Sequence, residues 1–155
     1  MSHVIAPAEA SHLLDIAYLF ATTRSPPGDP ALVARELHDE RTRPQTRLWI
    51  ALADAEGAGA AIAGALLAWQ VADELTILDV AVPLEHRRRG FGRALVVEAL
   101  RAARAEGGQL ALLEVRAGNA PARELYRSVG FEDVRVRRGY YADGEDGVEM
   151  HAPLG

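Results

Sequence analysis

The chain has 155 residues, of which 49% are hydrophobic and 25% charged, and this suits one compact domain with a sizeable core. Its 17 basic and 22 acidic residues give a net charge of -5, so we expect neither a general nucleic-acid binder nor a binder of anionic membranes. Cysteine is absent, which excludes disulfides, thiolate metal sites and a cysteine nucleophile. The N-terminal residues lack a signal-peptide pattern and no run is long enough to span a bilayer, so we expect a cytoplasmic single domain over residues 1–155.

The N-terminal part is expected to hold two helices separated by a loop. A helix within residues 8–21 is indicated by apolar residues at helical spacing, namely Leu13, Leu14, Ala17, Tyr18 and Ala21. The segment 25–30 is rich in proline and predicts a loop. Asp29 followed by Pro30 is typical of the cap and first turn of a second helix.

The middle of the chain is expected to form strands. The apolar runs 48–53 and 61–71 are separated by a segment with glycine and acidic residues, which predicts a strand, a turn and a strand. The alanine content of both runs leaves helix open as an alternative. A third apolar run, 75–82, predicts a strand that ends before Pro83.

The C-terminal half alternates between helix and strand signals. We expect a helix over 94–106, a central strand over 109–115 that is covered on both faces, and a helix that begins at 119. Two strands, 131–136 and 148–151, are expected to follow. This mixture predicts an α/β or α+β fold.

A glycine loop joins the strand over 75–82 to the helix after it. Its sequence is Arg87-Arg88-Arg89-Gly90-Phe91-Gly92-Arg93. A loop that opens a helix offers free backbone N–H groups and the positive end of the helix dipole, so it favours an anion such as phosphate. A tight turn without any ligand is the alternative. Neither the third glycine of a dinucleotide-binding loop nor the Gly-Lys-Ser/Thr ending of a nucleoside-triphosphate loop is present.

Candidate catalytic residues follow this loop. Glu114 interrupts an apolar strand, where a carboxylate is costly to desolvate unless it is hydrogen-bonded or borders a cavity, so it is a candidate general base. A strand-end glutamate that faces solvent or pairs with Arg116 is an equal alternative. Tyr126 lies on an apolar helix stripe and either packs in the core or donates a proton; Asn119 is a helix cap or a cofactor contact. The five histidines lack metal-ligand spacing, so no metal site is expected.

Together these residues resemble the GNAT superfamily of acyl-CoA-dependent N-acetyltransferases, and within it the RimI-like protein N-alpha-acetyltransferases. Arg87-x-x-Gly90-x-Gly92 matches the superfamily signature Gln/Arg-x-x-Gly-x-Gly/Ala. The segment from Leu113 to Tyr126, with Gly130-Phe131 after it, is similar to the RimI-like pattern Leu-Glu-Val-Arg-x-x-Asn…Leu-Tyr…Gly-Phe. The segment 137–141 is similar to the Arg-x-x-Tyr-Tyr segment of that group, and the resemblance covers residues 75–150.

The resemblance implies a mixed, mostly antiparallel sheet flanked by helices, with two central strands that splay apart to hold acyl-CoA. It implies Glu114 as the general base and Tyr126 as the general acid. It assigns backbone contacts with the pantetheine arm and the acetyl carbonyl to the strand end Val80, Ala81 and Val82. It assigns contacts with the pyrophosphate to the glycine-loop residues Arg88, Arg89, Gly90, Phe91, Gly92 and Arg93. It assigns a contact with the pantetheine end of the cofactor to Asn119.

The implied activity is direct acetyl transfer from acetyl-CoA to a protein N-terminal amine, such as that of a ribosomal protein, by a monomer or homodimer. The segment 23–30 has no tryptophan, whereas the corresponding loop of the group is often aromatic-rich. A small-molecule amine such as an aminoglycoside or polyamine therefore stays open as the acceptor, and the acidic balance suits it. A non-catalytic acyl-CoA-binding module is a separate alternative to the enzyme. Tyr140 and Tyr141 are candidates for an acceptor groove, with surface packing as an equal alternative.

Overall fold

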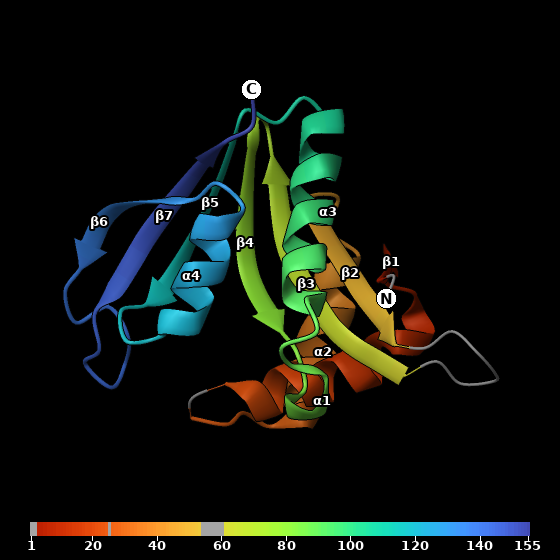
Figure 1. Ribbon diagram of the computed structural model, residues 1–155. Coiled ribbons are helices and arrows are strands. Elements are labelled where there is room, and N and C mark those ends of the chain that lie inside the picture. The colour runs from red at the N-terminus through yellow and green to blue at the C-terminus, as the bar shows by residue number, and fades with distance from the viewer. Residues whose placement is uncertain (1–2, 25, 54–60) are drawn as a thin grey trace.

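The computed structural model describes residues 3–24, 26–53 and 61–155. The described strands form one sheet in the order β1-β2-β3-β4-β5-β7-β6, and only β4 and β5 pair in parallel (Figure 1). The strands are β1 Val4–Pro7, β2 Thr46–Ala53, β3 Ala61–Val71, β4 Glu74–Ala81, β5 Leu110–Arg116, β6 Glu132–Arg137 and β7 Gly147–Pro153. The helices are α1 Leu13–Thr23, α2 Pro30–Arg41, α3 Phe91–Ala105 and α4 Ala120–Ser128, with short 3-10 helices at Ala10–His12 and Leu84–His86.

The helices cover the sheet from both sides. On one face, α1 and α2 pack on β2, β3 and β4, and Ile16, Phe20 and Ile50 are fully buried there. On the other face, α3 and α4 pack on a second cluster that includes Leu95 and Phe131. None of the described helices is long and apolar enough to cross a membrane.

The predicted class is confirmed: the fold mixes helices with a mostly antiparallel sheet. The runs over 48–53 and 61–71 are strands and not helices, because each pairs with neighbours along both edges. The predicted turn between them falls on residues 54–59, outside the described part of the chain. Asp29 caps α2 as expected, since its Oδ1 accepts from the backbone N–H of Ala31 at 3.0 Å.

Other sequence expectations need correction. The helix expected from residue 94 already begins at Phe91, so the glycine loop and the first helical turn overlap. The strand over 109–115 is covered on one face only, because buried and partly exposed residues alternate along β5. On α1, Leu14 and Tyr18 are 76% and 64% exposed, and the buried face runs through residues such as Ile16 and Phe20 instead.

Candidate active site

The parallel pairing of β4 and β5 stops before either strand ends. The last register pair joins Ile77 to Leu113, whereas β4 continues to Ala81 and β5 to Arg116. Beyond that pair β5 remains bonded to β7, and Figure 1 shows β4 and β5 diverging toward their C-terminal ends. The last residues of β4 therefore have backbone N–H and C=O groups along an edge that β5 does not occupy, and such groups are strong partners for an extended ligand.

A β-bulge in β4 lies at the point of divergence. Ala68 of β3 pairs with Ile77 and the preceding Leu67 pairs with Asp79, which leaves Leu78 as the extra residue. A bulge bends its strand and increases the local twist. The bend therefore lies where β4 separates from β5. We call the part of the sheet beyond the last pair, Ile77 and Leu113, where β4 and β5 are no longer paired, the gap.

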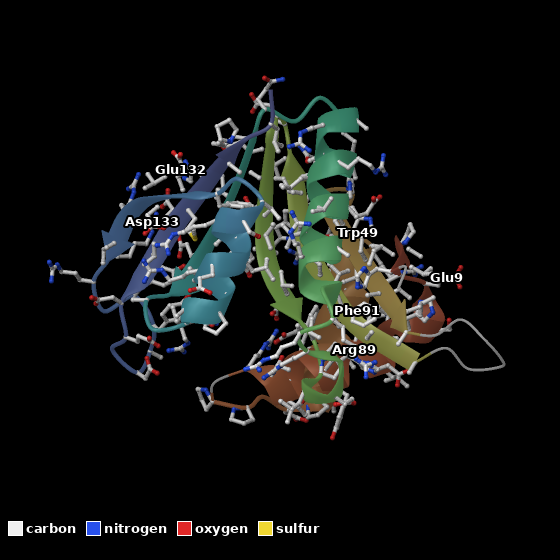
Figure 2. The ribbon with its side chains drawn as sticks, in the orientation of Figure 1. Glu9, Trp49, Arg89, Phe91, Glu132 and Asp133 are labelled. Atoms are coloured by element: carbon white, nitrogen blue, oxygen red, sulfur yellow. The ribbon has the colours of Figure 1, made fainter. Side chains whose placement is uncertain are left out.

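The loop between β4 and α3 is held against the end of β4. The Nε of Arg87 donates to the carbonyl oxygen of Val82 at 3.1 Å. Arg88 and Gly90 both have left-handed backbones, with φ of +64° and +83°. Gly90 is the N-cap of α3 and makes no side-chain hydrogen bond to the helix. The backbone N–H groups of the first helical turn therefore face the loop without an acceptor from the capping side chain. Figure 2 shows Arg89 at this end of α3.

The small size of the two glycines is required by the protein itself. A Cβ at Gly90 would lie 3.2 Å from the His3 ring, and a Cβ at Gly92 would lie 3.2 Å from Leu125 of α4. Phe91 between them is 3% exposed, and its ring packs edge-on with the His3 ring at a centroid distance of 4.8 Å. Only the backbone at these positions is therefore available to a ligand.

The other residues predicted to contact a cofactor lie around the same gap. Ala81 is buried, and Val80 and Val82 pack partly against the core beneath α3, so at the end of β4 too the backbone is the part left for a ligand. The side chains of Arg88, Arg89 and Arg93 are exposed, which leaves them able to meet an anion at the loop.

Asn119 is a helix cap, as one of its two sequence interpretations predicted. It precedes α4, and its side-chain oxygen accepts from the backbone N–H of Ala122 at 3.3 Å. That bond uses the amide oxygen and not the amide nitrogen. A contact between Asn119 and a cofactor stays a prediction.

Glu114 lies on β5 directly after the last pair with β4. Its neighbours Leu113 and Val115 point into the core, so Glu114 points to the opposite face of the sheet. Its side chain is 23% exposed, and its Oε1 lies 3.0 Å from the Nε of Arg137. Its Oε2 is buried and has no hydrogen-bond partner among the described residues. An oxygen with free lone pairs beside a gap is able to accept a proton from a bound group.

Tyr126 belongs to α4, on the other side of the sheet. Its ring packs edge-on against Phe131 at a centroid distance of 5.8 Å, which agrees with the core-packing interpretation. Burial raises the pKa of Tyr126 to about 12, and the charges of Asp79 and Tyr141 act in the same direction. The phenol therefore holds its proton at neutral pH, as a proton donor must.

Sequence reasoning did not single out Asp79 or Arg137. Asp79 follows the bulge, and its carboxylate lies 3.7 Å from Arg24 at the end of α1. Burial raises the pKa of Asp79 to about 6, against the opposing effect of Arg24. Both residues carry a signal that could have been noticed: Asp79 interrupts an apolar strand just as Glu114 does, and Arg137 belongs to the motif segment 137–141.

The loop between β6 and β7 is fastened beside Glu114. Arg116 forms ion pairs with Asp143 and Glu145, each at 2.9 Å, and its guanidinium lies 4.1 Å from the centre of the Tyr141 ring. The pKa of Tyr140 is raised, first by the nearby Glu114 carboxylate and then by burial. Both tyrosines therefore lie near the predicted base. The described part of the chain holds no group of three or more His, Asp or Glu side chains placed to bind a metal ion.

The glycine loop, the gap and the residues around it agree with the results of comparison with known proteins. The family model described as acetyltransferase (GNAT) family matches residues 13–131. The chain belongs to the acetyltransferase (GNAT) family. An N-alpha-acetyltransferase from Sulfurisphaera tokodaii is 43% identical to this GNAT chain over 79 residues, which make up 50% of this chain and 47% of that protein.

Two further comparisons point to the same branch of the family. The [ribosomal protein bS18]-alanine N-acetyltransferase of Escherichia coli is 41% identical to this GNAT chain over 87 residues, or 54% of this chain and 59% of that protein. The chain thus spans about half the length of the curated relatives it matches. The crystal structure of the ribosomal-protein-S18-alanine N-acetyltransferase from Escherichia coli superposes with a TM-score of 0.83 and 26% identity, and covers 99% of this chain and 95% of that one.

Proposed function

We propose that this GNAT chain transfers an acetyl group directly from acetyl-CoA to a primary amine, and that the acceptor is a protein N-terminal amine. The observation that carries the proposal is the position of Glu114 on β5, directly after the last residue that pairs with β4. Glu114 offers a buried oxygen without a hydrogen-bond partner among the described residues, and Tyr126 holds a phenolic proton. The proposal treats residues 1–155 as one acetyltransferase domain; a cytoplasmic location and a monomeric or homodimeric state stay predictions.

The residues at the gap fit acetyl-CoA. The unpaired edge at the end of β4 offers backbone partners at Val80, Ala81 and Val82 for the amide-containing pantetheine arm. The loop of residues 88–93 offers backbone N–H groups and exposed guanidinium groups for the pyrophosphate, and Asn119 would contact the pantetheine end. When bound, acetyl-CoA supplies the acetyl group as a thioester.

In this proposal Glu114 prepares the acceptor. An N-terminal amine has a pKa of about 8, so at pH 7 it is mostly an ammonium ion and cannot act as a nucleophile. Glu114 takes one proton from it, and Arg137 beside the carboxylate stabilises the ionised base before that step. Tyr126 holds a proton at its phenolic oxygen for the sulfur that departs as the amide bond forms.

The choice of acceptor rests on the relatives. A protein named N-alpha-acetyltransferase matches at 43% identity over 50% of this chain, and one named [ribosomal protein bS18]-alanine N-acetyltransferase matches at 41% identity over 54% of it. The net charge of -5 favours a cationic acceptor of either kind, a peptide or a polyamine. The acceptor therefore has to be identified by experiment.

An unbiased screen of peptides and small amines with acetyl-CoA, followed by release of free CoA, tests the proposal. We expect turnover with a subset of peptide N-termini. Turnover with polyamines or aminoglycosides alone would replace the acceptor and keep the chemistry. Binding of acetyl-CoA without turnover of any acceptor would identify a non-catalytic acyl-CoA-binding module and refute the proposed activity.

A further inference from the structure

A row of charged side chains crosses the sheet beside the predicted base, on the face opposite α4. Glu114 of β5 is in register with Glu149 of β7, and Glu149 is in register with Arg135 of β6. Residues directly opposite each other on neighbouring strands point to the same face. Two carboxylates therefore lie side by side, an arrangement that repulsion disfavours unless a cation is shared between them.

Arg137 is that shared cation. Its Nη2 donates to Glu149 Oε1 at 2.6 Å, and its Nε lies 3.0 Å from Glu114 Oε1. Glu149 is the more deeply buried of the two carboxylates, with a side chain 8% exposed against 23% for Glu114. The stronger contact of the guanidinium is thus with the carboxylate that has no place in the proposed chemistry.

Glu149 is held in its ionised form by every cation around it. Burial works to raise its pKa, but the hydrogen bonds from Arg137 and His151 and the charge of Arg135 outweigh burial, and the pKa of Glu149 is lowered. The His151 Nε2 lies 2.6 Å from Glu149 Oε2. The charged or titratable groups near Glu114 and Glu149 include Arg135, Arg137 and His151 on the neighbouring strands, Arg116 on the same face of β5, and Tyr140 and Tyr141 from the loop after β6.

We propose that Glu149 is a positioning residue for the base: it shares Arg137 with Glu114 and takes up part of the arginine's charge, so that Glu114 stays ionised and still basic enough to accept a proton. This inference rests on the proposed role of Glu114. An arginine paired with Glu114 alone would stabilise the carboxylate and weaken it as a base. Glu149 alone would repel the ionised form of Glu114 and favour its protonation. The two neighbours therefore act on Glu114 in opposite directions, and their balance sets the pH at which the base becomes active.

The opposite effects of Glu149 and Arg137 on the ionisation of Glu114 provide the test. The pH dependence of kcat/KM is measured with acetyl-CoA and an acceptor peptide found in the screen, and its acid limb reports the ionisation of the base. Glu149→Gln removes one negative charge and keeps the shape, so the acid limb should move to lower pH by roughly one unit. Arg137→Gln should move it to higher pH by a similar amount. In the double variant the two shifts should largely cancel.

Arg137→Gln removes the guanidinium that Glu114 and Glu149 share and can prevent folding, so Glu149→Gln and the double variant decide the outcome. Glu74→Gln is the matched control: it removes the same charge from the start of β4, at the end of the sheet away from the gap, and should leave the profile unchanged. An acid limb that stays in place in folded Glu149→Gln would overturn the inference. Absence of turnover in the unmodified chain would instead refute the proposed function.

Discussion

The loop between β4 and α3 offers the sharpest test of cofactor binding, through Gly90→Ala. Gly90 has φ of +83°, a left-handed conformation that costs a residue with a Cβ about 1–2 kcal/mol. The new Cβ would also lie 3.2 Å from the His3 ring, closer than ordinary van der Waals contact. The contact can be relieved by a shift of the His3 ring, but the backbone strain can be relieved only by moving the loop, which also holds Arg88 at φ of +64°.

The size of the effect follows from that strain. If the loop relaxes in the free protein, binding of CoA must restore its original conformation. The binding free energy is then less favourable by up to the strain energy that the relaxation released. A cost of about 1–1.4 kcal/mol weakens binding by roughly five- to tenfold. The same strain lowers the stability of a domain of this size by about 2–4 °C in Tm.

Gly107→Ala is the matched control. Gly107 has φ of +86°, almost the same as Gly90, and a Cβ there would meet nothing within 4 Å. It lies after the C-terminal end of α3, away from the loop. Both variants should lose similar stability in thermal unfolding, and only Gly90→Ala should lose affinity for CoA in titration calorimetry. Equal CoA affinity for Gly90→Ala and the unmodified protein would show that this loop is not the binding site.

Four further substitutions test other parts of the structure. Glu114→Gln and Tyr126→Phe should each lower kcat by about 10²–10⁴-fold and leave CoA affinity unchanged in calorimetry; full activity in both would refute the proposed acid and base. Burial raises the pKa of Asp79 from 3.8 to about 6 despite Arg24, so the folded chain binds this proton more tightly than the unfolded chain, and stability falls as pH rises from about 4 to 6. Asp79→Asn should remove that loss and raise the unfolding free energy at pH 7.5, but not at pH 4, by about 1–3 kcal/mol in urea titrations; an unchanged pH dependence would contradict this. Phe131→Ala, at a site 1% exposed, should cost about 3–5 kcal/mol in the same assay, and a cost below about 1 kcal/mol would show that the site is not tightly packed.

The local part of the fold could be predicted from the sequence because its signals lie close together along the chain. Turn residues and apolar runs placed β4, the glycine loop and α3 in order, and Asp29 capped α2 as expected. The pairing of strands was not accessible in this way. β7 lies between β5 and β6, although it follows both in sequence, and that order depends on contacts between distant segments.

The exposed face of α1 shows why spacing alone is an incomplete guide. Leu14 and Tyr18 have the helical spacing of a buried stripe, yet both are exposed, because the sheet contacts the face that carries Ile16 and Phe20. Several stripes can be drawn on a helix this apolar. Only its packing partner decides which of them is buried.

Three acidic residues of the site show how a carboxylate in an otherwise apolar strand can be interpreted. Asp79, Glu114 and Glu149 each interrupt an apolar strand, and each lies where the strand leaves ordinary core packing. The three carboxylates differ in their partners: Asp79 pairs with Arg24, Glu114 pairs with Arg137, and Glu149 pairs with Arg135, Arg137 and His151. Because desolvation is costly for all three, the number of cations available to each one determines how readily it ionises. Glu114 differs from Glu149 in keeping a buried oxygen without a hydrogen-bond partner among the described residues, whereas the two oxygens of Glu149 are bonded to Arg137 and His151.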